Sequence, residues 1–233
     1  MWVSMSDDAP APVPPATDRT SHADVAPTAE EFRQRYDDGQ TPWDIGRPQP
    51  VFLRHESEVQ GSVLDVGCGT GELALHFAAR DHLVTGVDSA AAAIAIAEQT
   101  RDRLGVPAEF LVADATDLAG LHNRFDTVLD CLVFHCFNDE ERVRYVSGLR
   151  QVLRPGGRLL MLVFSDQEPP GNGPRRISAY DLAKSFAAGF RVRSLEPERI
   201  VVREHDQQLF TPDGPYGWFA IIDRLDDGVL PAT

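Results

Sequence analysis

Cysteine is scarce in this sequence, and long apolar runs are absent. The three cysteines, Cys68, Cys131 and Cys136, are an odd number in a chain of 233 residues, which argues against a disulfide framework. Their spacing matches no zinc site either, so we expect no metal. No run of 18 apolar residues occurs, so we expect no membrane-spanning helix. The first residues carry acids where a secretory signal needs bases, so we expect a cytoplasmic protein.

Positive charge is also in short supply. Lysine and arginine number 22 against 36 aspartates and glutamates, which gives a formal net charge of -14. An acidic surface repels phosphate backbones and anionic lipid, so we expect no nucleic-acid partner and no membrane partner. The content of 42% hydrophobic and 25% charged residues is ordinary for a soluble domain. We expect one catalytic domain with additions, as a monomer or homodimer.

The N-terminal 60 residues differ from the rest. Residues 1–27 are rich in Pro, Ala, Asp and Ser, so we expect a disordered tail. The sequence TAEE at 28–31 has capping-box spacing, with Thr28 at the N-cap, and predicts a helix to about Tyr36. A second helix is expected over 50–59. We interpret 28–60 as an N-terminal helical cap or lid and 61–233 as the catalytic domain.

From residue 61, short apolar runs bounded by Gly or Asp alternate with longer helical patterns. Strands are expected at 62–66, 83–88, 109–114, 125–130 and 158–164, and helices at 70–80, 89–103 and 139–153. RPGG at 154–157 is expected to end the last of these helices as a C-cap. This alternation predicts an α/β fold with a parallel sheet and helices on both faces. A further helix is expected over 178–190 with Ser178 as N-cap. Two late strands are expected at 190–202 and 217–225. The segment between them is too short for a crossover helix, which favours an antiparallel pair.

The sequence LDVGCGTGE at 64–72 places Gly67, Gly69 and Gly71 between a strand and a helix. Such glycines permit a tight turn and let a ligand lie against the backbone at the positive end of a helix. A glycine-rich turn without a ligand is the alternative. The spacing G-x-G-x-G differs from the nicotinamide fingerprint G-x-G-x-x-G, and no triphosphate-binding G-x-x-x-x-G-K-[ST] loop is present.

Acidic residues follow or end the predicted strands around this loop. Asp65, Asp88, Asp114 and Asp130 lie at the carboxyl ends of four strands, which meet at one crevice in an open α/β sheet. A crevice lined with carboxylates repels a diphosphate and binds it poorly. It suits a cofactor that carries an amine and a sulfonium cation.

LDVGCGTGE, followed by GVD, FDTVLD and LRPGG, resembles the class I S-adenosylmethionine-dependent methyltransferases over residues 61–165. The resemblance implies a Rossmann-like, doubly wound, seven-stranded sheet with an antiparallel last strand. It implies S-adenosyl-L-methionine as cofactor and S-adenosyl-L-homocysteine as product. The residues that it implies for cofactor binding are Asp65, Gly67, Cys68, Gly69 and Gly71 around the methionine part, Asp88 at the ribose, Ser89 beside the adenosine, Asp114 and Ala115 at the adenine edge, and Asp130 with Cys131 in the same crevice.

Two segments indicate the class of methyl acceptor, one after the fourth predicted strand and one before the first. Methyltransferases that act on base amines carry an Asn/Asp-Pro-Pro-aromatic run where this chain has DCLVFHCF. The segment with TPWDIGRPQP is similar to thiopurine methyltransferases and to mycobacterial heterocyclic toxin methyltransferases. This implies methyl transfer to oxygen or nitrogen of a small aromatic heterocycle, a toxin or xenobiotic. A thiol S-methyltransferase and a non-catalytic S-adenosylmethionine-binding regulator remain alternatives.

His135, just past the fourth strand, is the candidate catalytic base, because an unperturbed imidazole pKa near 6.5 suits that role. A histidine that caps the strand or packs beneath the next helix is the alternative. Tyr36, Phe134, Phe137 and Asp166 are the candidate contacts to the acceptor.

Trp43, within the proline-rich stretch 41–50, is expected to pack over the cofactor and to help close the site to water. Its alternative role is to anchor the N-terminal helices by burial. Asp44 is expected at the same site or as a cap for the following turn.

Overall fold

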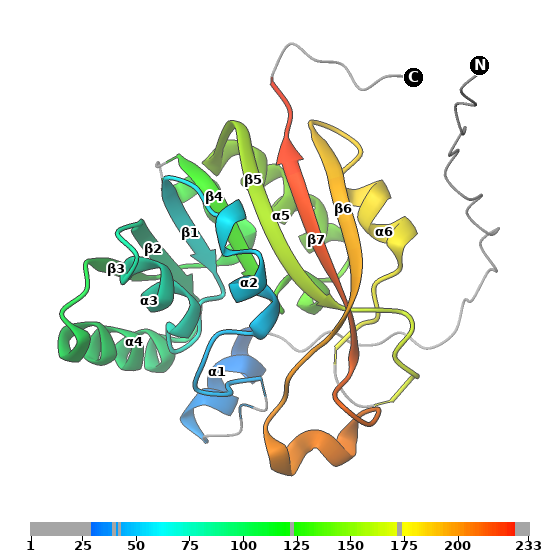
Figure 1. Cartoon of the computed structure of the whole chain (residues 1–233), viewed down its shortest axis with the longest axis horizontal. Helices are drawn as coiled ribbons and strands as arrows, with labels where there is room; N and C mark the ends of the chain where they lie inside the picture. Colours follow the sequence, from blue (N-terminus) through cyan, green and yellow to red (C-terminus); the bar gives the residue numbers. More distant parts are fainter. Residues whose placement is uncertain (1–28, 39–40, 42, 122–123, 172–173, 227–233) are drawn as a thin grey trace, which may run out of the picture.

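A seven-stranded sheet with the strand order β3-β2-β1-β4-β5-β7-β6 forms the centre of the molecule (Figure 1). The computed structural model describes residues 29–38, 41, 43–121, 124–171 and 174–226. The strands are β1 (Ser62–Val66), β2 (Leu83–Asp88), β3 (Ala108–Val112), β4 (Phe125–Cys131), β5 (Leu153–Phe164), β6 (Phe190–Arg199) and β7 (Tyr216–Arg224). The proposed tail and the Thr28 cap lie outside the described residues.

Strands β1 to β5 pair in parallel, and β7 runs antiparallel to both β5 and β6. The predicted parallel sheet with an antiparallel pair at its end is therefore confirmed. In β1 the run SVLDV is buried along nearly its whole length, as expected of a central parallel strand with both faces covered.

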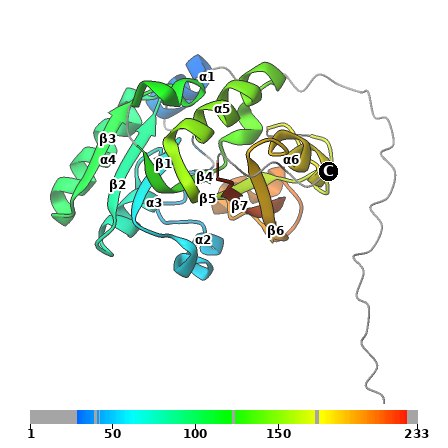
Figure 2. The same ribbon diagram turned by 90° about the horizontal axis from the view of Figure 1, so that it is seen from above.

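Helices cover both faces of the sheet (Figure 2). The α-helices are α1 (Ala29–Asp37), α2 (Pro50–Arg54), α3 (Glu72–Ala78), α4 (Ala91–Leu104), α5 (Asp139–Val152) and α6 (Ala179–Ser185). The 3-10 helices are η1 (Glu56–Glu58), η2 (Ala115–Leu121), η3 (Phe134–Cys136) and η4 (Glu204–Leu209). Helices α2, α3 and α4 share one apolar cluster with the sheet, and η2, α5 and α6 share the other.

Two predicted helices and their ends need correction. The helix expected over 50–59 is split, because the backbone leaves the helical region at His55, between α2 and η1. The helix expected over 178–190 ends at Ser185, although Ser178 is its N-cap and shares a capping box with Asp181.

The prediction that RPGG caps a helix is wrong. Helix α5 ends at Val152, and the next residue, Leu153, already pairs with Phe125 of β4. The register then shifts, so that Thr127 pairs with Arg158 and the intervening residues form an irregularity at the start of β5. Gly156 takes a φ of +75° there, which a glycine adopts without steric cost.

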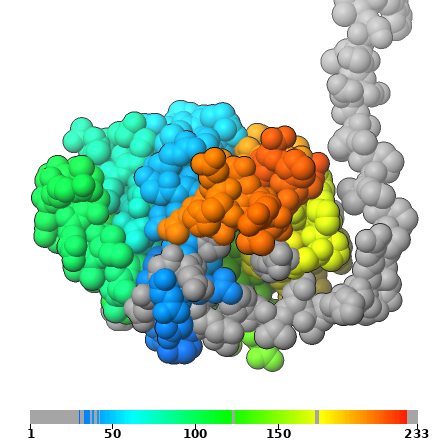
Figure 3. Space-filling model, turned by 90° about the horizontal axis from the view of Figure 1, so that it is seen from below, coloured from blue at the N-terminus to red at the C-terminus, as the bar shows by residue number. Residues whose placement is uncertain are grey.

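The carboxyl ends of the parallel strands lie at one end of the molecule, where segments distant in sequence meet. In the space-filling view of that end, the chain from α1 to α2 is blue and lies beside the orange segment that follows β6 (Figure 3). Among the described helices, none is long and apolar enough to cross a membrane.

Candidate active site

The glycine loop, residues 67–71, connects β1 to α3 with a left-handed backbone at each of its three glycines. A Cβ atom at Gly67 would lie 2.3 Å from Cγ2 of Val133, and one at Gly69 would lie 2.6 Å from the hydroxyl of Tyr36. Both distances are far below van der Waals contact. The loop therefore depends on glycine for its conformation and for close approach by neighbouring groups.

Asp88, at the end of β2, holds this loop in place. Its Oδ2 accepts a hydrogen bond from the backbone N–H of Gly69, and its Oδ1 accepts one from Ala90, each at 2.9 Å. Burial raises the pKa of the Asp88 carboxyl, and these backbone hydrogen bonds oppose that rise. The acid predicted for the ribose thus lies directly beside the glycine loop.

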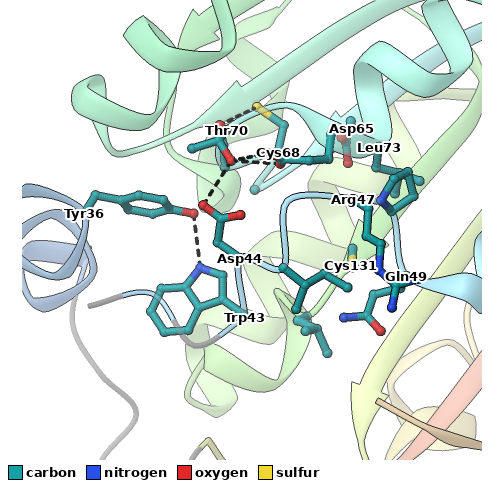
Figure 4. A pocket seen from close by; sticks show the side chains of 16 residues that line it. Tyr36, Trp43, Asp44, Arg47, Gln49, Asp65, Cys68, Thr70, Leu73 and Cys131 are labelled. Carbon is teal, nitrogen blue, oxygen red and sulfur yellow. Dashed lines mark hydrogen bonds between the residues drawn. The ribbon is translucent and has the colours of Figure 1, made fainter. Parts of the chain in front are cut away.

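A strap, defined as Thr41 and residues 43–49, crosses in front of the loop (Figure 4). The indole Nε1 of Trp43 donates to the hydroxyl of Tyr36 at 3.1 Å, and the two rings meet edge to face. Oδ2 of Asp44 accepts from the Thr70 hydroxyl at 3.2 Å, while its Oδ1 accepts from Gly46 N–H and closes the next turn. Asp44 therefore caps the next turn and also contacts the glycine loop.

The strap is attached to the segment that follows β6. The side-chain amide of Gln49 exchanges two hydrogen bonds with the backbone of Val201, at 2.8 and 3.0 Å. The guanidinium of Arg203 donates to the carbonyl of Asp44 at 2.6 Å and to the hydroxyl of Thr41 at 2.9 Å. Sequence reasoning missed Gln49 and Arg203, because the bonded residues are more than 150 positions apart.

The strap and the glycine loop enclose a cavity. Its lining residues are Tyr36, Trp43, Asp44, Ile45, Arg47, Pro48, Gln49, Asp65, Gly67, Cys68, Gly69, Thr70, Glu72, Leu73, Cys131 and Leu132. Three carboxylates and one guanidinium belong to this lining. The cavity is thus predominantly acidic.

Asp65 is the most deeply buried of these carboxylates, with 1% of its surface exposed. Its Oδ2 atom has no hydrogen-bond partner. Burial raises the pKa of Asp65 well above its usual range, and a hydrogen bond from the backbone of Ala74 opposes this rise. A buried acceptor without a partner costs free energy, so the site favours a ligand that donates hydrogen bonds and carries positive charge.

Asp130, at the end of β4, is fully buried and already satisfied. Its Oδ1 accepts from the backbone N–H groups of Val133 and Phe134, and its Oδ2 accepts from the Tyr145 hydroxyl at 2.8 Å. Burial raises its pKa to about 6. Asp130 thereby fixes the turn after β4, where Leu132 adopts a φ of +70° that is strained for a branched side chain.

His135 is 2% exposed and lies behind this turn, outside the cavity lining. Its Nδ1 accepts a hydrogen bond from the backbone N–H of Phe164 at 3.0 Å. Burial, followed by the charges of Arg142 and Arg176, lowers its pKa to about 3. The imidazole is therefore neutral at physiological pH and poorly disposed to take up a proton.

The other residues predicted to contact the acceptor are dispersed. Phe134 is fully buried, and Phe137 packs on the Tyr145 ring at 5.1 Å between centroids. Asp166 is exposed and accepts from Trp218 Nε1 at 3.4 Å. Tyr36 instead lines the cavity at the glycine loop.

The residues predicted for the adenosine lie outside the cavity lining. Asp114 is exposed, and its Oδ1 accepts from the backbone N–H of Thr116 at 2.7 Å. Ser89, directly after β2, and Ala115, directly after Asp114, are half-buried. Cys68 and Cys131 do line the cavity, and burial raises the pKa of both thiols.

Comparison with known proteins links this geometry to methyl transfer. The model of a family described as "Methyltransferase domain" matches residues 63–157. The 2-heptyl-1-hydroxyquinolin-4(1H)-one methyltransferase of Mycobacteroides abscessus is 34% identical over 164 residues, covering 68% of this chain and 72% of that protein. The probable thiol methyltransferase 2 of Arabidopsis thaliana is 28% identical over 178 residues, covering 73% and 78%.

Two solved structures extend the likeness. One, from work on the conversion of a disulfide bond into a thioacetal group during echinomycin biosynthesis, has a TM-score of 0.74 at 33% identity, covering 86% of this chain and 94% of that chain. The 1,6-didemethyltoxoflavin-N1-methyltransferase of Burkholderia thailandensis, with S-adenosylhomocysteine bound, has a TM-score of 0.66 at 24% identity, covering 94% and 95%. The second likeness supports the fold alone.

Proposed function

This chain belongs to the class I S-adenosylmethionine-dependent methyltransferases, and we propose that it methylates oxygen or nitrogen of a small aromatic heterocycle of the hydroxyquinolone type. The observation that carries the proposal is the acidic cavity enclosed by the glycine loop and the strap. The 34% identity to a hydroxyquinolone methyltransferase supports the acceptor class. When bound, S-adenosylmethionine supplies an electrophilic methyl group on a sulfonium cation.

The residues present fit that cofactor. The unpartnered Oδ2 of Asp65 suits the ammonium of the methionine part, since both are otherwise poorly compensated when buried. The carboxylates of Asp44 and Glu72 add negative charge to the same lining. Gly67 and Gly69 let Val133 and Tyr36 pack directly against the loop, because a Cβ at either position would clash with those side chains.

We assign the remaining cofactor contacts from the family resemblance. Asp88 and Ser89 would bind the ribose side, Asp114 and Ala115 the adenine edge, and Cys131 the floor of the crevice. Trp43 would cover the cofactor and exclude water. The assignment divides the chain into an N-terminal cap, which includes the strap, and a catalytic domain that begins at about residue 61.

For the acceptor, positioning matters more than proton transfer. Methyl transfer depends on holding the nucleophile and the methyl group in line in a dry site. The base role of His135 stays a prediction. Its buried, neutral ring and its bond to Phe164 N–H support a positioning role at the end of β5.

Thiol S-methylation is the second candidate, supported by the 28% identity to a probable thiol methyltransferase over 78% of that protein. A regulator that binds the cofactor without catalysis is the candidate from another class. We further propose a cytoplasmic monomer or homodimer, without nucleic-acid partners, that acts on toxins or xenobiotics. The three free thiols and the net charge of -14 support that setting.

Calorimetric titration tests the cofactor. We expect S-adenosylhomocysteine to bind with one site per chain and NAD not to bind. Binding of NAD without any response to S-adenosylhomocysteine would refute the proposal. Binding of S-adenosylhomocysteine without turnover of any aromatic hydroxyl, ring nitrogen or thiol would favour the regulator.

A further inference from the structure

We propose that Arg142, in the first turn of α5, anchors a subsite for the ionised form of the aromatic acceptor, a phenolate-like oxyanion or a thiolate. The inference rests on the proposed function and specifies the charge state in which that acceptor binds. Four features carry it: the burial of Arg142, the two guanidinium nitrogens without hydrogen-bond partners, the positive charges around it, and the aromatic rings beside it.

The guanidinium of Arg142 is buried without adequate compensation. The residue is 5% exposed, and its Nε and Nη2 atoms have no hydrogen-bond partner. Among the described residues, its ion pair is a loose one, with 3.9 Å between Nη1 and Oδ1 of Asp139, whose side chain is 80% exposed. Burial lowers the pKa of Arg142 to about 10. A buried charge left in this state costs several kcal/mol, and a bound anion would offset that cost.

The carboxylates near Arg142 are already engaged. Asp139 holds Arg175 at 2.5 Å, and Asp181 forms the capping box with Ser178. Cys136, the other group that faces the guanidinium, has a thiol whose pKa is raised by burial and which is therefore neutral. The charges of Asp139 and Asp181 raise the pKa of Arg142 and so oppose the effect of burial, but neither carboxylate accepts a hydrogen bond from its Nε or Nη2 atom.

Positive charge accumulates around Arg142. Arg142 lies in the first turn of a 14-residue helix, where the helix dipole is positive and a cation is unfavourable. Arg175 lowers the pKa of Arg142, and Arg142 and Arg176 together lower that of His135. In a chain with a net charge of -14, this local field favours an anion.

Aromatic rings complete the subsite. The Cζ atom of Arg142 lies 4.9 Å from the centroid of the Phe134 ring, and that of Arg176 lies 5.2 Å from the Phe164 ring. Phe134 begins η3, directly after the turn whose Cys131 and Leu132 line the cofactor cavity. The chemistry that matches rings and guanidinium groups in one place is a planar aromatic anion. Because the guanidinium is covered, binding requires neighbouring side chains to shift.

Recognition of the anion also accounts for the chemical step without a base. The acceptor loses its proton to solvent when it ionises, before transfer. Its lone pair then forms the bond to the methyl carbon, while the carbon–sulfur bond breaks and its electron pair stays on sulfur as a neutral thioether. A positive and a negative charge are thereby consumed together, and His135 need not take up a proton.

The direct test uses 4-nitrophenol, whose absorption reports its ionisation, with S-adenosylhomocysteine present. We expect wild-type protein to bind the phenolate and to lower the apparent pKa of bound 4-nitrophenol. Arg142→Met should weaken binding by about tenfold or more, the size of one charge-assisted contact. Arg144→Met, an exposed arginine on the same helix, is the matched control and should leave binding unchanged.

Thermal unfolding separates a ligand subsite from a structural arginine. Without ligand, Arg142→Met should keep or raise Tm, because an uncompensated buried charge is replaced by an apolar chain of similar length. If that variant fails to fold, Arg142→Lys should keep the bound phenol ionised with a several-fold weaker affinity. Wild-type protein that does not bind 4-nitrophenolate, or variants that bind it as tightly as wild type, would overturn the subsite. Neither result bears on the binding of S-adenosylhomocysteine, which tests the proposed function separately.

Discussion

The region proposed for the cofactor, called the cofactor half, and the region proposed for the acceptor, called the acceptor half, are built in different ways. The cofactor half, made of the glycine loop, Asp65 and the strap, consists of backbone in unusual conformations and of carboxylates. The acceptor half, made of Phe134, His135, Arg142 and Phe164, consists of buried rings and of cations. One half has a buried carboxylate oxygen without a hydrogen-bond partner, and the other has two buried guanidinium nitrogens without one.

This difference has a direct chemical meaning. A sulfonium cofactor with an ammonium group suits the acidic half, and an ionised acceptor suits the basic half. Both unpartnered groups weigh against the stability of the ligand-free fold, as is common where structure is kept for binding. The polarity of the crevice thus matches a reaction between a cation and an anion.

The largest effect is expected from Gly67→Ala, which breaks the cofactor half. The new Cβ would lie 2.3 Å from Val133 in a backbone with a φ of +62°. Clash and strain each cost about 1–3 kcal/mol, so affinity for S-adenosylhomocysteine should fall about 100-fold. Calorimetry measures the loss.

Gly105→Ala is the control for that variant, since Gly105 has a φ of +67° but no atom within 4 Å of an added Cβ. It should lower Tm slightly and leave affinity unchanged. Equal affinities in the two variants would mean that the loop does not need close approach.

The next largest effect is expected from Asp65→Asn, which removes a negative charge from the cofactor half. Loss of an ionic contact to the ammonium should weaken S-adenosylhomocysteine binding by about 30-fold, near 2 kcal/mol. Because burial raises the pKa of Asp65, wild-type affinity should rise with pH until the carboxyl is ionised, and then level off. The variant should show no such rise in calorimetric titrations over the same pH range.

Without ligand, Asp65→Asn should stabilise the fold, in contrast to its effect on cofactor binding. The folded chain holds the Asp65 proton more tightly than the unfolded chain does, so this residue lowers the free energy of unfolding as pH rises above about 4. Asp65→Asn should therefore raise Tm at neutral pH. A lower Tm would show that the carboxylate is compensated in the free protein.

Trp43→Ala should have a smaller effect, about fivefold to tenfold on cofactor affinity, because it removes ring contact but no ionic contact. Trp43→Phe keeps a ring and loses the hydrogen bond to Tyr36. It should lie between Trp43→Ala and wild type, with the same Tm. Unchanged affinity in Trp43→Ala would leave Trp43 as a packing anchor for the N-terminal helix.

The smallest effect is expected from His135→Asn, in the acceptor half. A positioning role predicts that kcat falls by less than about tenfold with an unchanged pH profile, since the ring is already neutral. General bases contribute about 10²–10⁴-fold. A loss of that size, together with a missing limb in the pH profile of kcat/KM, would restore His135 as the base.

The sequence was informative where structure is set locally. The bounds of β1 and β2 match the prediction, because each is a short apolar run closed by Gly or Asp. RPGG was misread, because its backbone is set by pairing of β5 with β4 and not by the preceding helix.

In the site, too, the features set by local sequence could be predicted and those set by tertiary contacts could not. The glycine loop and Asp65, which line the cavity, stand out in the sequence by their local spacing. The attachment of the strap through Gln49 and Arg203, and the burial of Arg142, depend on contacts between distant segments that leave no local pattern. The low pKa of His135 likewise results from tertiary burial and from arginines on other elements.

A methyl-transfer assay tests the central claim most directly. Purified protein with S-adenosylmethionine would be given 2-heptyl-1-hydroxyquinolin-4(1H)-one, a simple phenol and an aromatic thiol, with products identified by mass spectrometry. We predict one added methyl group per acceptor and one S-adenosylhomocysteine formed, with the more acidic acceptors turned over fastest. No methylated product from any of these acceptors, in protein that binds S-adenosylhomocysteine, would contradict it.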